Sequence, residues 1–229
     1  MKIILKLKKS FLQNSSFYTM NDQSKYGNNK VLILAGGNSS RMNFPKAWLP
    51  YDSEKTILEQ LVLSYKHIGC QQIVVVMNGK FIDYSPENVE SLGEDVCIVR
   101  NEHPEKGRIH SLKLGIRQLE RSGLTFIHNV DNPMVDHETI EALMRSPVNG
   151  YVRPVINGKG GHPILVTNGV LENILHADDS VILKDLLQEH ACEDVPVSDL
   201  GIFCNINTPE DYRNALGMEV PPLKRTPNP

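Results

Sequence analysis

Short uninterrupted apolar runs alternate along this chain with stretches whose apolar residues recur three or four positions apart. The apolar runs, which are typical of buried strands, lie at 31–35, 72–77, 96–99 and 124–130. The helical patterns lie at 57–65, 107–121 and 137–145. Strands that alternate with helices imply a mostly parallel sheet covered on both faces. The predicted fold class is therefore α/β, with a three-layer α/β/α Rossmann-like arrangement.

The second half of the chain predicts a hairpin followed by shorter elements. Apolar runs at 151–155 and 164–166 flank a glycine-rich segment at 157–163, which indicates a hairpin with a long tip. Helices are predicted near 168–175 and 181–189, and short strands at 194–197 and 201–204. A last helix is predicted to start at Thr208, because Pro209 suits its first position and Asp211 can close a capping box.

The length and composition fit one domain. A chain of 229 residues with 40% hydrophobic residues can bury one good-sized core. We expect that domain at 30–217, between a disordered leader at 1–29 and a loose proline-rich tail at 218–229. Met20 is an alternative start within the leader. No run approaches the roughly 20 apolar residues that span a bilayer, so no membrane partner is expected.

Charge and cysteine content point to a small partner in a reducing compartment. The formal net charge of -3 gives no overall attraction to nucleic acid, so an anionic substrate must be met by a local cluster of cations. The cysteines are far apart and form no Cys-x-x-Cys pair, which argues against a zinc site and a disulfide scaffold. A cytoplasmic location is therefore expected.

The segment 34–46 combines a strand end, two glycines, small hydroxyl residues and two cations. Glycines let the backbone amides approach an anion, and arginine and lysine side chains bind phosphate oxygens. The spacing is neither that of a P-loop nor that of a dinucleotide-binding loop, which argues against kinases and dehydrogenases. The alternative is a glycine turn with incidental surface cations. The predicted nucleotide-binding residues here are Leu34, Ala35, Gly36, Gly37, Asn38, Ser39, Arg41 and Lys46.

The pattern Gly37-x-Ser39-x-Arg41-Met42 followed by Lys46 resembles the signature of the MobA-like nucleotidyltransferases, which include molybdenum cofactor guanylyltransferases and cytidylyltransferases. The resemblance implies a GT-A-like nucleotidyltransferase fold and catalytic roles for Arg41 and Lys46. The family usually has glycine where this chain has Asn43, and asparagine tolerates a positive φ better than most residues.

Two further segments extend the resemblance. Asp131, which precedes Asn132-Pro133 at the end of a predicted strand, matches the family's acidic metal ligand and implies bound Mg²⁺ with a catalytic role. The alternative is an aspartate that caps the next helix. Gly107 and Ser111 resemble the nucleoside-contacting segment of the cytidylyltransferase branch, although an ordinary amphipathic helix gives the same pattern.

The remaining matches concern the acceptor and the metal. His162, between Gly161 and Pro163, resembles a residue beside the acceptor in the cytidylyltransferase branch, and a structural histidine in a hairpin is the alternative. Asn205 occupies a position where cytidylyltransferases commonly have aspartate and guanylyltransferases asparagine. The resemblance makes Asn205 a second metal ligand, and a strand-end turn residue is the alternative.

The hypothesis that follows is transfer of CMP or GMP from CTP or GTP to a phosphorylated acceptor, with release of pyrophosphate. The resemblance favours a cytidylyltransferase acting on the molybdenum cofactor, with a molybdoenzyme or chaperone as a protein partner. A sugar-phosphate or phospho-alcohol nucleotidyltransferase and a non-catalytic nucleotide-binding regulator stay open as alternatives. A serine or cysteine hydrolase finds no support, because the chain has no Gly-x-Ser-x-Gly elbow.

Overall fold

The central sheet has the mostly parallel topology that the strand pattern predicts. The computed structural model describes residues 28–223, and the predicted leader up to residue 27 and the tail from residue 224 lie outside the described residues. The strands within residues 28–223 follow the order β3 (Val96–Asn101), β2 (Gln72–Asn78), β1 (Lys30–Ala35), β4 (Thr125–Asn129), β7 (Ile164–Val166), β5 (Gly150–Ile156) and β6 (Lys159–Gly160), with β8 (Ala191–Pro196) paired to β5. Strands β1 to β4 pair in parallel, and β7 is antiparallel to both β4 and β5.

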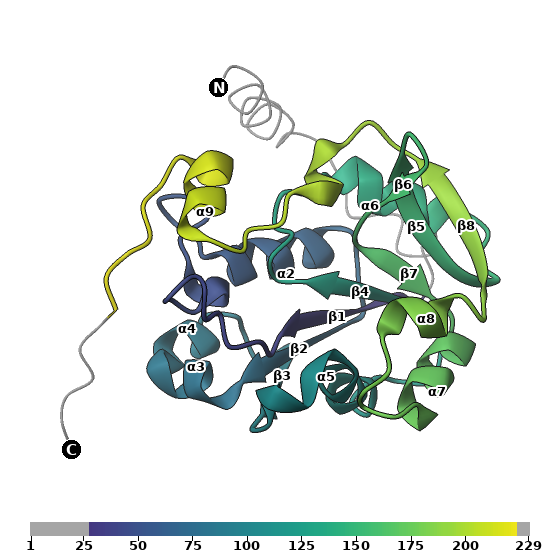
Figure 1. Cartoon of the computed structure of the whole chain (residues 1–229), viewed down its shortest axis with the longest axis horizontal. Helices are drawn as coiled ribbons and strands as arrows, with labels where there is room; N and C mark the ends of the chain where they lie inside the picture. Colours follow the sequence, from purple (N-terminus) through teal and green to yellow (C-terminus); the bar gives the residue numbers. More distant parts are fainter. Residues whose placement is uncertain (1–27, 224–229) are drawn as a thin grey trace.

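Helices cover both faces of this sheet (Figure 1). Their bounds are α2 (Ile57–His67), α3 (Gly79–Tyr84), α4 (Pro86–Glu90), α5 (Gly107–Ile116), α6 (His137–Arg145), α7 (Asn168–His176), α8 (Leu183–Leu187) and α9 (Pro209–Leu216). Helices α2, α6 and α9 pack on the face that carries Val31 and Ile33 of β1, and α5, α7 and α8 pack on the face of Leu32 and Leu34. Because successive side chains of a strand point to opposite faces, β1 contributes to both layers of the core. The three-layer prediction is confirmed.

Several predicted boundaries differ from the structure for local reasons. The helix predicted at 107–121 ends at Ile116, after which turns continue the apolar period and keep Leu119 buried. The predicted strand at 201–204 is wrong: residues 200–203 form a 3₁₀ helix, because the Asp199 side chain accepts a hydrogen bond from the Gly201 amide at its start. The predicted hairpin of 151–155 with 164–166 is confirmed as the β5–β7 pair.

The start of the last helix is also confirmed. The Asp211 amide donates to Thr208 Oγ1 at 3.2 Å, and the Thr208 amide donates to Asp211 Oδ2 at 2.9 Å, which is a complete capping box. Gly217 closes α9 in the left-handed conformation with φ 69°. The box fixes the direction in which residues 205–207 enter the helix, and those residues lie at the site described below.

Close approach of α5 to the sheet generates a stability prediction. A Cβ on Gly115 would lie 2.2 Å from Leu32 Cδ1 and 2.8 Å from Val76 Cγ2. Gly115→Ala is therefore expected to lower the free energy of unfolding by about 1–3 kcal/mol, as overpacking of a core does. The control is Gly169→Ala in α7, where the nearest atom would be 3.7 Å away and where alanine favours the helix. Urea unfolding of both variants measures the difference, and equal stability of the two would contradict this account of the packing.

Candidate active site

The loop that follows β1 is held in its conformation by backbone hydrogen bonds and buried anchors. The amides of Met42 and Asn43 both donate to the carbonyl of Ser39, at 2.9 and 3.2 Å. The Met42 and Phe44 side chains are buried in the core, which ties the loop to the α2 face of the sheet. Asn43 has φ 53°, the left-handed conformation for which the family's usual glycine is suited. Ser39 also has a positive φ, 48°, which the sequence did not predict.

The first glycine of this loop lies against the start of α5. A Cβ on Gly36 would be 3.1 Å from Ser111 Oγ and 3.2 Å from Asn101 Nδ2. Asn101 Nδ2 donates to Ser111 Oγ at 3.1 Å, and Ser111 Oγ donates to the Gly107 carbonyl at 3.2 Å. The Ser111 hydroxyl and the Asn101 amide therefore leave little room for a side chain at position 36. Gly107, at φ 88°, has no atom within 4 Å of the Cβ position and stays open to a ligand.

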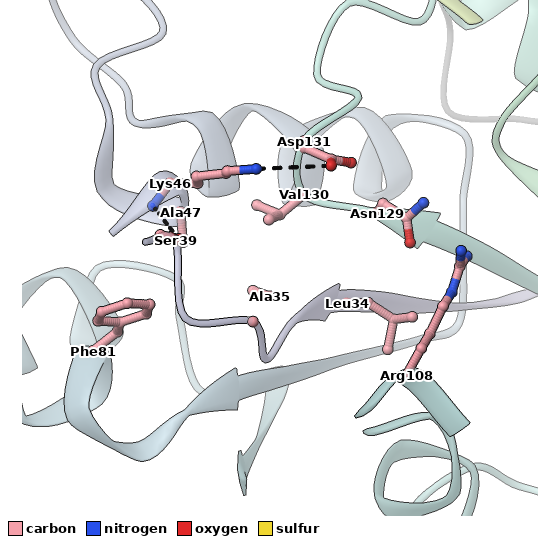
Figure 2. A pocket seen from close by; sticks show the side chains of 11 residues that line it. Leu34, Ala35, Ser39, Lys46, Ala47, Phe81, Arg108, Asn129, Val130 and Asp131 are labelled. Carbon is pink, nitrogen blue, oxygen red and sulfur yellow. Dashed lines mark hydrogen bonds and ion pairs between the residues drawn. The ribbon is translucent and has the colours of Figure 1, made fainter. Parts of the chain in front are cut away.

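The acidic residue reaches the same edge of the sheet from β4. Strand β4 pairs in parallel with β1, Leu34 lies opposite Asn129, and the Val130 amide donates to the Leu34 carbonyl at 3.0 Å. Asp131 Oδ2 then lies 3.8 Å from Lys46 Nζ (Figure 2). Between the two loops is a cavity of about 270 Å³. Its lining residues are Leu34, Ala35, Gly37, Ser39, Lys46, Ala47, Phe81, Arg108, Asn129, Val130 and Asp131.

A buried histidine fixes the turn that carries Asp131. His128 has no exposed surface, its Nδ1 lies 2.8 Å from the Tyr65 hydroxyl, and its Nε2 lies 2.9 Å from the Asn132 carbonyl. Because a carbonyl only accepts, Nε2 carries the proton and Nδ1 accepts from Tyr65. Burial lowers the pKa of His128 to about 4, so the ring is neutral at pH 7. Sequence reasoning missed this residue, although a histidine inside an apolar strand run was its signal.

The charged side chains around the cavity shift one another's pKa values. Burial raises the pKa of Asp131, and the nearby Lys46 and Arg108 oppose that rise. Burial lowers the pKa of Lys46, while Asp131 raises it and Arg41 lowers it further. Partial desolvation lowers the pKa of the Arg108 guanidinium, although the residue as a whole is exposed, and Asp131 opposes that fall. One carboxylate among three cations leaves a positive field suited to a triphosphate.

The segment before α9 completes the site, through a residue that the sequence did not single out. Asn207 Oδ1 accepts from Lys46 Nζ at 2.8 Å and from Arg41 Nη2 at 3.2 Å. The Ile206 amide donates to the Asp131 carbonyl at 2.8 Å, which joins this segment to the acidic turn. Asn205, the predicted metal ligand, is exposed, and its Nδ2 donates to the Phe203 carbonyl at 3.4 Å.

His162 lies close to the same charges. Its Nδ1 is buried without a hydrogen-bond partner, and its amide donates to the Ile202 carbonyl at 3.3 Å. Burial lowers the pKa of His162 to about 3, and Arg108 and His128 lower it further, so the ring is neutral. His162 does not line the cavity between the two loops. Its role beside an acceptor stays a prediction.

The residues at Asp131 fit a hard cation. Asp131 Oδ1 is buried and has no hydrogen-bond partner, which leaves one carboxylate oxygen available as a ligand. Residues 28–223 contain no group of three or more His, Cys, Asp or Glu side chains that could hold a metal ion. A site of this kind suits Mg²⁺, which usually keeps waters and takes further ligands from substrate phosphates.

All four cysteines, Cys70, Cys97, Cys192 and Cys204, are free thiols. In the part of the chain that the structure describes, no helix is long and apolar enough to cross a bilayer.

A glycine-containing loop and a carboxylate lie at the ends of adjacent parallel strands, around a cavity with several cations, and this arrangement fits a protein that binds nucleotides. Comparison with known proteins agrees with that class. Residues 31–195 match the MobA-like NTP transferase domain. The chain therefore belongs to the MobA-like NTP transferase family and is an enzyme that transfers nucleotides, as its motifs predicted.

The curated relatives include both guanylyltransferases and cytidylyltransferases. A probable molybdenum cofactor guanylyltransferase from Bacillus mycoides is 31% identical over 80% of this chain and 94% of its own length. A molybdenum cofactor cytidylyltransferase from Escherichia coli is 23% identical over 80% of this chain and 93% of its own.

Solved structures share the fold. A protein from Mycobacterium tuberculosis H37Rv superposes with a TM-score of 0.69 at 20% identity, covering 83% of this chain and 98% of its own. The same protein has been solved in complex with manganese, with a TM-score of 0.62 at 18% identity over 83% and 98% of the two chains.

The buried His128 generates a prediction about acid stability. Its pKa in the folded protein, about 4, is below the ordinary value of 6.5, so its contribution to stability is complete above pH 6.5 and is lost as the pH falls towards 4. At roughly 1.4 kcal/mol per pH unit, the free energy of unfolding falls by about 3 kcal/mol between pH 6.5 and pH 4. His128→Gln, which does not titrate, is expected to lose correspondingly less stability in urea unfolding between pH 6.5 and 4.

The control for that experiment is His176→Gln, an exposed position whose Nδ1 contacts the Glu172 carbonyl. It should keep the acid dependence of the wild type. An unchanged pH dependence in His128→Gln would show that this ring does not stay neutral in the folded protein.

Proposed function

We propose that this enzyme transfers a nucleotide from CTP or GTP to a phosphorylated small-molecule acceptor and releases pyrophosphate. The observation that carries the proposal is the shared cavity, where Lys46 and Arg108 flank Asp131 beside the glycine-containing loop. An oxygen of the acceptor phosphate forms a bond to the α-phosphorus while the bond from that phosphorus to the bridging oxygen of pyrophosphate breaks. Such transfers depend on positioning and charge neutralisation, which this cavity can supply.

The loop after β1 would hold the departing phosphates. Backbone amides of residues 36–39 can donate to phosphate oxygens, because glycines leave them accessible. Arg41 would bind these oxygens with two donors and Lys46 with a compact charge. Both side chains are already brought together by Asn207 Oδ1, so little reorganisation is needed. An ionised acceptor phosphate needs no general base.

Asp131 would hold Mg²⁺ through its unpartnered Oδ1, with the amide of Asn205 as a second ligand directly or through water. The ion, when bound, would neutralise charge on the α-phosphate and on the leaving pyrophosphate. The manganese complex of the M. tuberculosis protein, which shares this fold, supports a divalent cation.

Nucleotide and acceptor are proposed from the relatives and the motifs. The names of both relatives specify the molybdenum cofactor, so its pterin phosphate is the first acceptor to test. CTP is the first nucleotide to test, because the segments around Gly107 and His162 resemble the cytidylyltransferase branch. GTP is the alternative, because Asn205 and the guanylyltransferase relative favour it. Gly107 and Ser111 would contact the nucleoside, and His162 the acceptor.

Lys46→Ala tests the role of the loop. Turnover, measured as pyrophosphate release with CTP or GTP and a panel of pterin, sugar and alcohol phosphates, is expected to fall at least about tenfold through loss of an electrostatic stabiliser. Lys184→Ala, on the exposed side of α8, is the matched control and should keep full turnover.

Nucleotide binding is measured in the same proteins as thermal stabilisation by each of the four nucleoside triphosphates with Mg²⁺. Absence of stabilisation by every triphosphate in the wild type would contradict the proposed function. Unchanged turnover of Lys46→Ala would instead remove Lys46 from the site.

Asp131→Asn tests the metal site while keeping the size of the side chain. The variant is expected to need at least about tenfold more Mg²⁺ for half-maximal stabilisation by the nucleotide, because a neutral amide binds a hard cation less strongly than a carboxylate does. The control is Asp185→Asn, in α8 and away from the cavity. A magnesium titration identical to that of the wild type would place the ion elsewhere.

A further inference from the structure

Arg108 is a cation of the cavity that the proposed reaction has not yet used. It is the second residue of α5 and lines the cavity together with Lys46 and Asp131. Arg41 and Lys46 are both engaged by Asn207. Among the described residues, by contrast, the Arg108 guanidinium makes no hydrogen bond or ion pair, although Asp131 attracts it electrostatically. Its donors are therefore available to a ligand.

Arg108 enters the cavity from the side opposite Lys46. Figure 2 shows Lys46 approaching Asp131 from the loop after β1, whereas Arg108 rises from α5 beside Leu34 and Asn129. The guanidinium and the Asp131 carboxylate both line the cavity and attract each other without forming an ion pair. The cavity thus has one cationic group on each side of its single carboxylate.

A second polar group lies on the Arg108 side. His162 Nδ1 is buried without a partner, and the ring is near enough to Arg108 for the two groups to interact electrostatically. A neutral imidazole can donate one hydrogen bond to a phosphate oxygen without adding charge. These groups complement an anion rather than a neutral hydroxyl.

An in-line displacement requires the attacking oxygen and the leaving oxygen on opposite sides of the α-phosphorus. If Arg41 and Lys46 hold the leaving pyrophosphate, the incoming group must approach from the other side of Asp131. We propose that Arg108 binds the phosphate of the acceptor there, with His162 as a second donor, and so selects phosphomonoesters as acceptors. This assignment rests on the proposed function, because it takes the loop after β1 as the site of the leaving group.

The experiment separates binding of the two substrates. Isothermal titration calorimetry gives the dissociation constant of α,β-methylene CTP or GTP with Mg²⁺, whichever stabilises the wild type. It then gives the dissociation constant of inorganic phosphate, used as the acceptor probe, with that nucleotide saturating. Arg108→Gln is expected to weaken phosphate binding at least about tenfold through loss of a charged bidentate contact. Its affinity for the nucleotide should change less than about threefold.

Two further variants make the result specific. Arg108→Lys keeps the charge but not the planar pair of donors, so its phosphate affinity should lie between those of the wild type and Arg108→Gln. Arg117→Gln replaces an exposed arginine at the other end of α5 and should match the wild type in both titrations. Melting temperatures without ligand show that each variant is folded.

The outcomes distinguish this assignment from the function on which it rests. Weaker phosphate binding with retained nucleotide binding supports Arg108 as the acceptor residue. A wild type that binds nucleotide but no phosphate, or an Arg108→Gln variant in which nucleotide binding falls as much as phosphate binding, overturns the assignment and leaves the proposed function standing. A wild type that binds no nucleotide overturns both.

Discussion

The parallel pairing of β1 with β4 is the constraint on which the site depends. The pairing places Leu34, near the end of β1, opposite Asn129, the last residue of β4. The Val130 amide extends the pairing by a hydrogen bond to the Leu34 carbonyl. Lys46 and Asp131, far apart in sequence, meet only because these two strands end at one edge. A shift of one residue in this register would move Asp131 by about 3.3 Å along the strand and turn every side chain of β4 to the other face.

Polar groups outside the cavity keep its charges in place. The His128 ring fixes the turn of Asp131, and Asn207 holds Lys46 and Arg41 together. Burial disfavours the charged form of Asp131 and of Lys46, and each offsets part of that cost for the other. The remaining excess of positive charge is what a triphosphate would neutralise. The structure therefore already holds these donors in position, which would limit reorganisation during the proposed transfer.

The sequence predicted those parts of the site that follow from local pattern and sheet topology. The glycine-containing loop and Asp131 each follow a buried apolar run, and the rule that such ends share an edge is sufficient to bring them together. Arg108 and Asn207 escaped prediction because their partners lie in elements remote in sequence. His128 stands in an apolar strand run, but its partner Tyr65 lies in a different element, α2. Nothing near Asn207 in the chain indicates that its amide oxygen lies between two cations of another loop.

The loop after β1 has a positive φ at Asn43, the position where the family usually has glycine. Met42 and Phe44 are buried on either side of Asn43, so the backbone at Asn43 has to reverse between two fixed anchors. That reversal needs a positive φ, which asparagine reaches at modest cost and a β-branched residue does not. The amides on the Ser39 carbonyl then close the turn and direct the chain to Lys46. The conformation, rather than glycine itself, is what places the lysine beside Asp131.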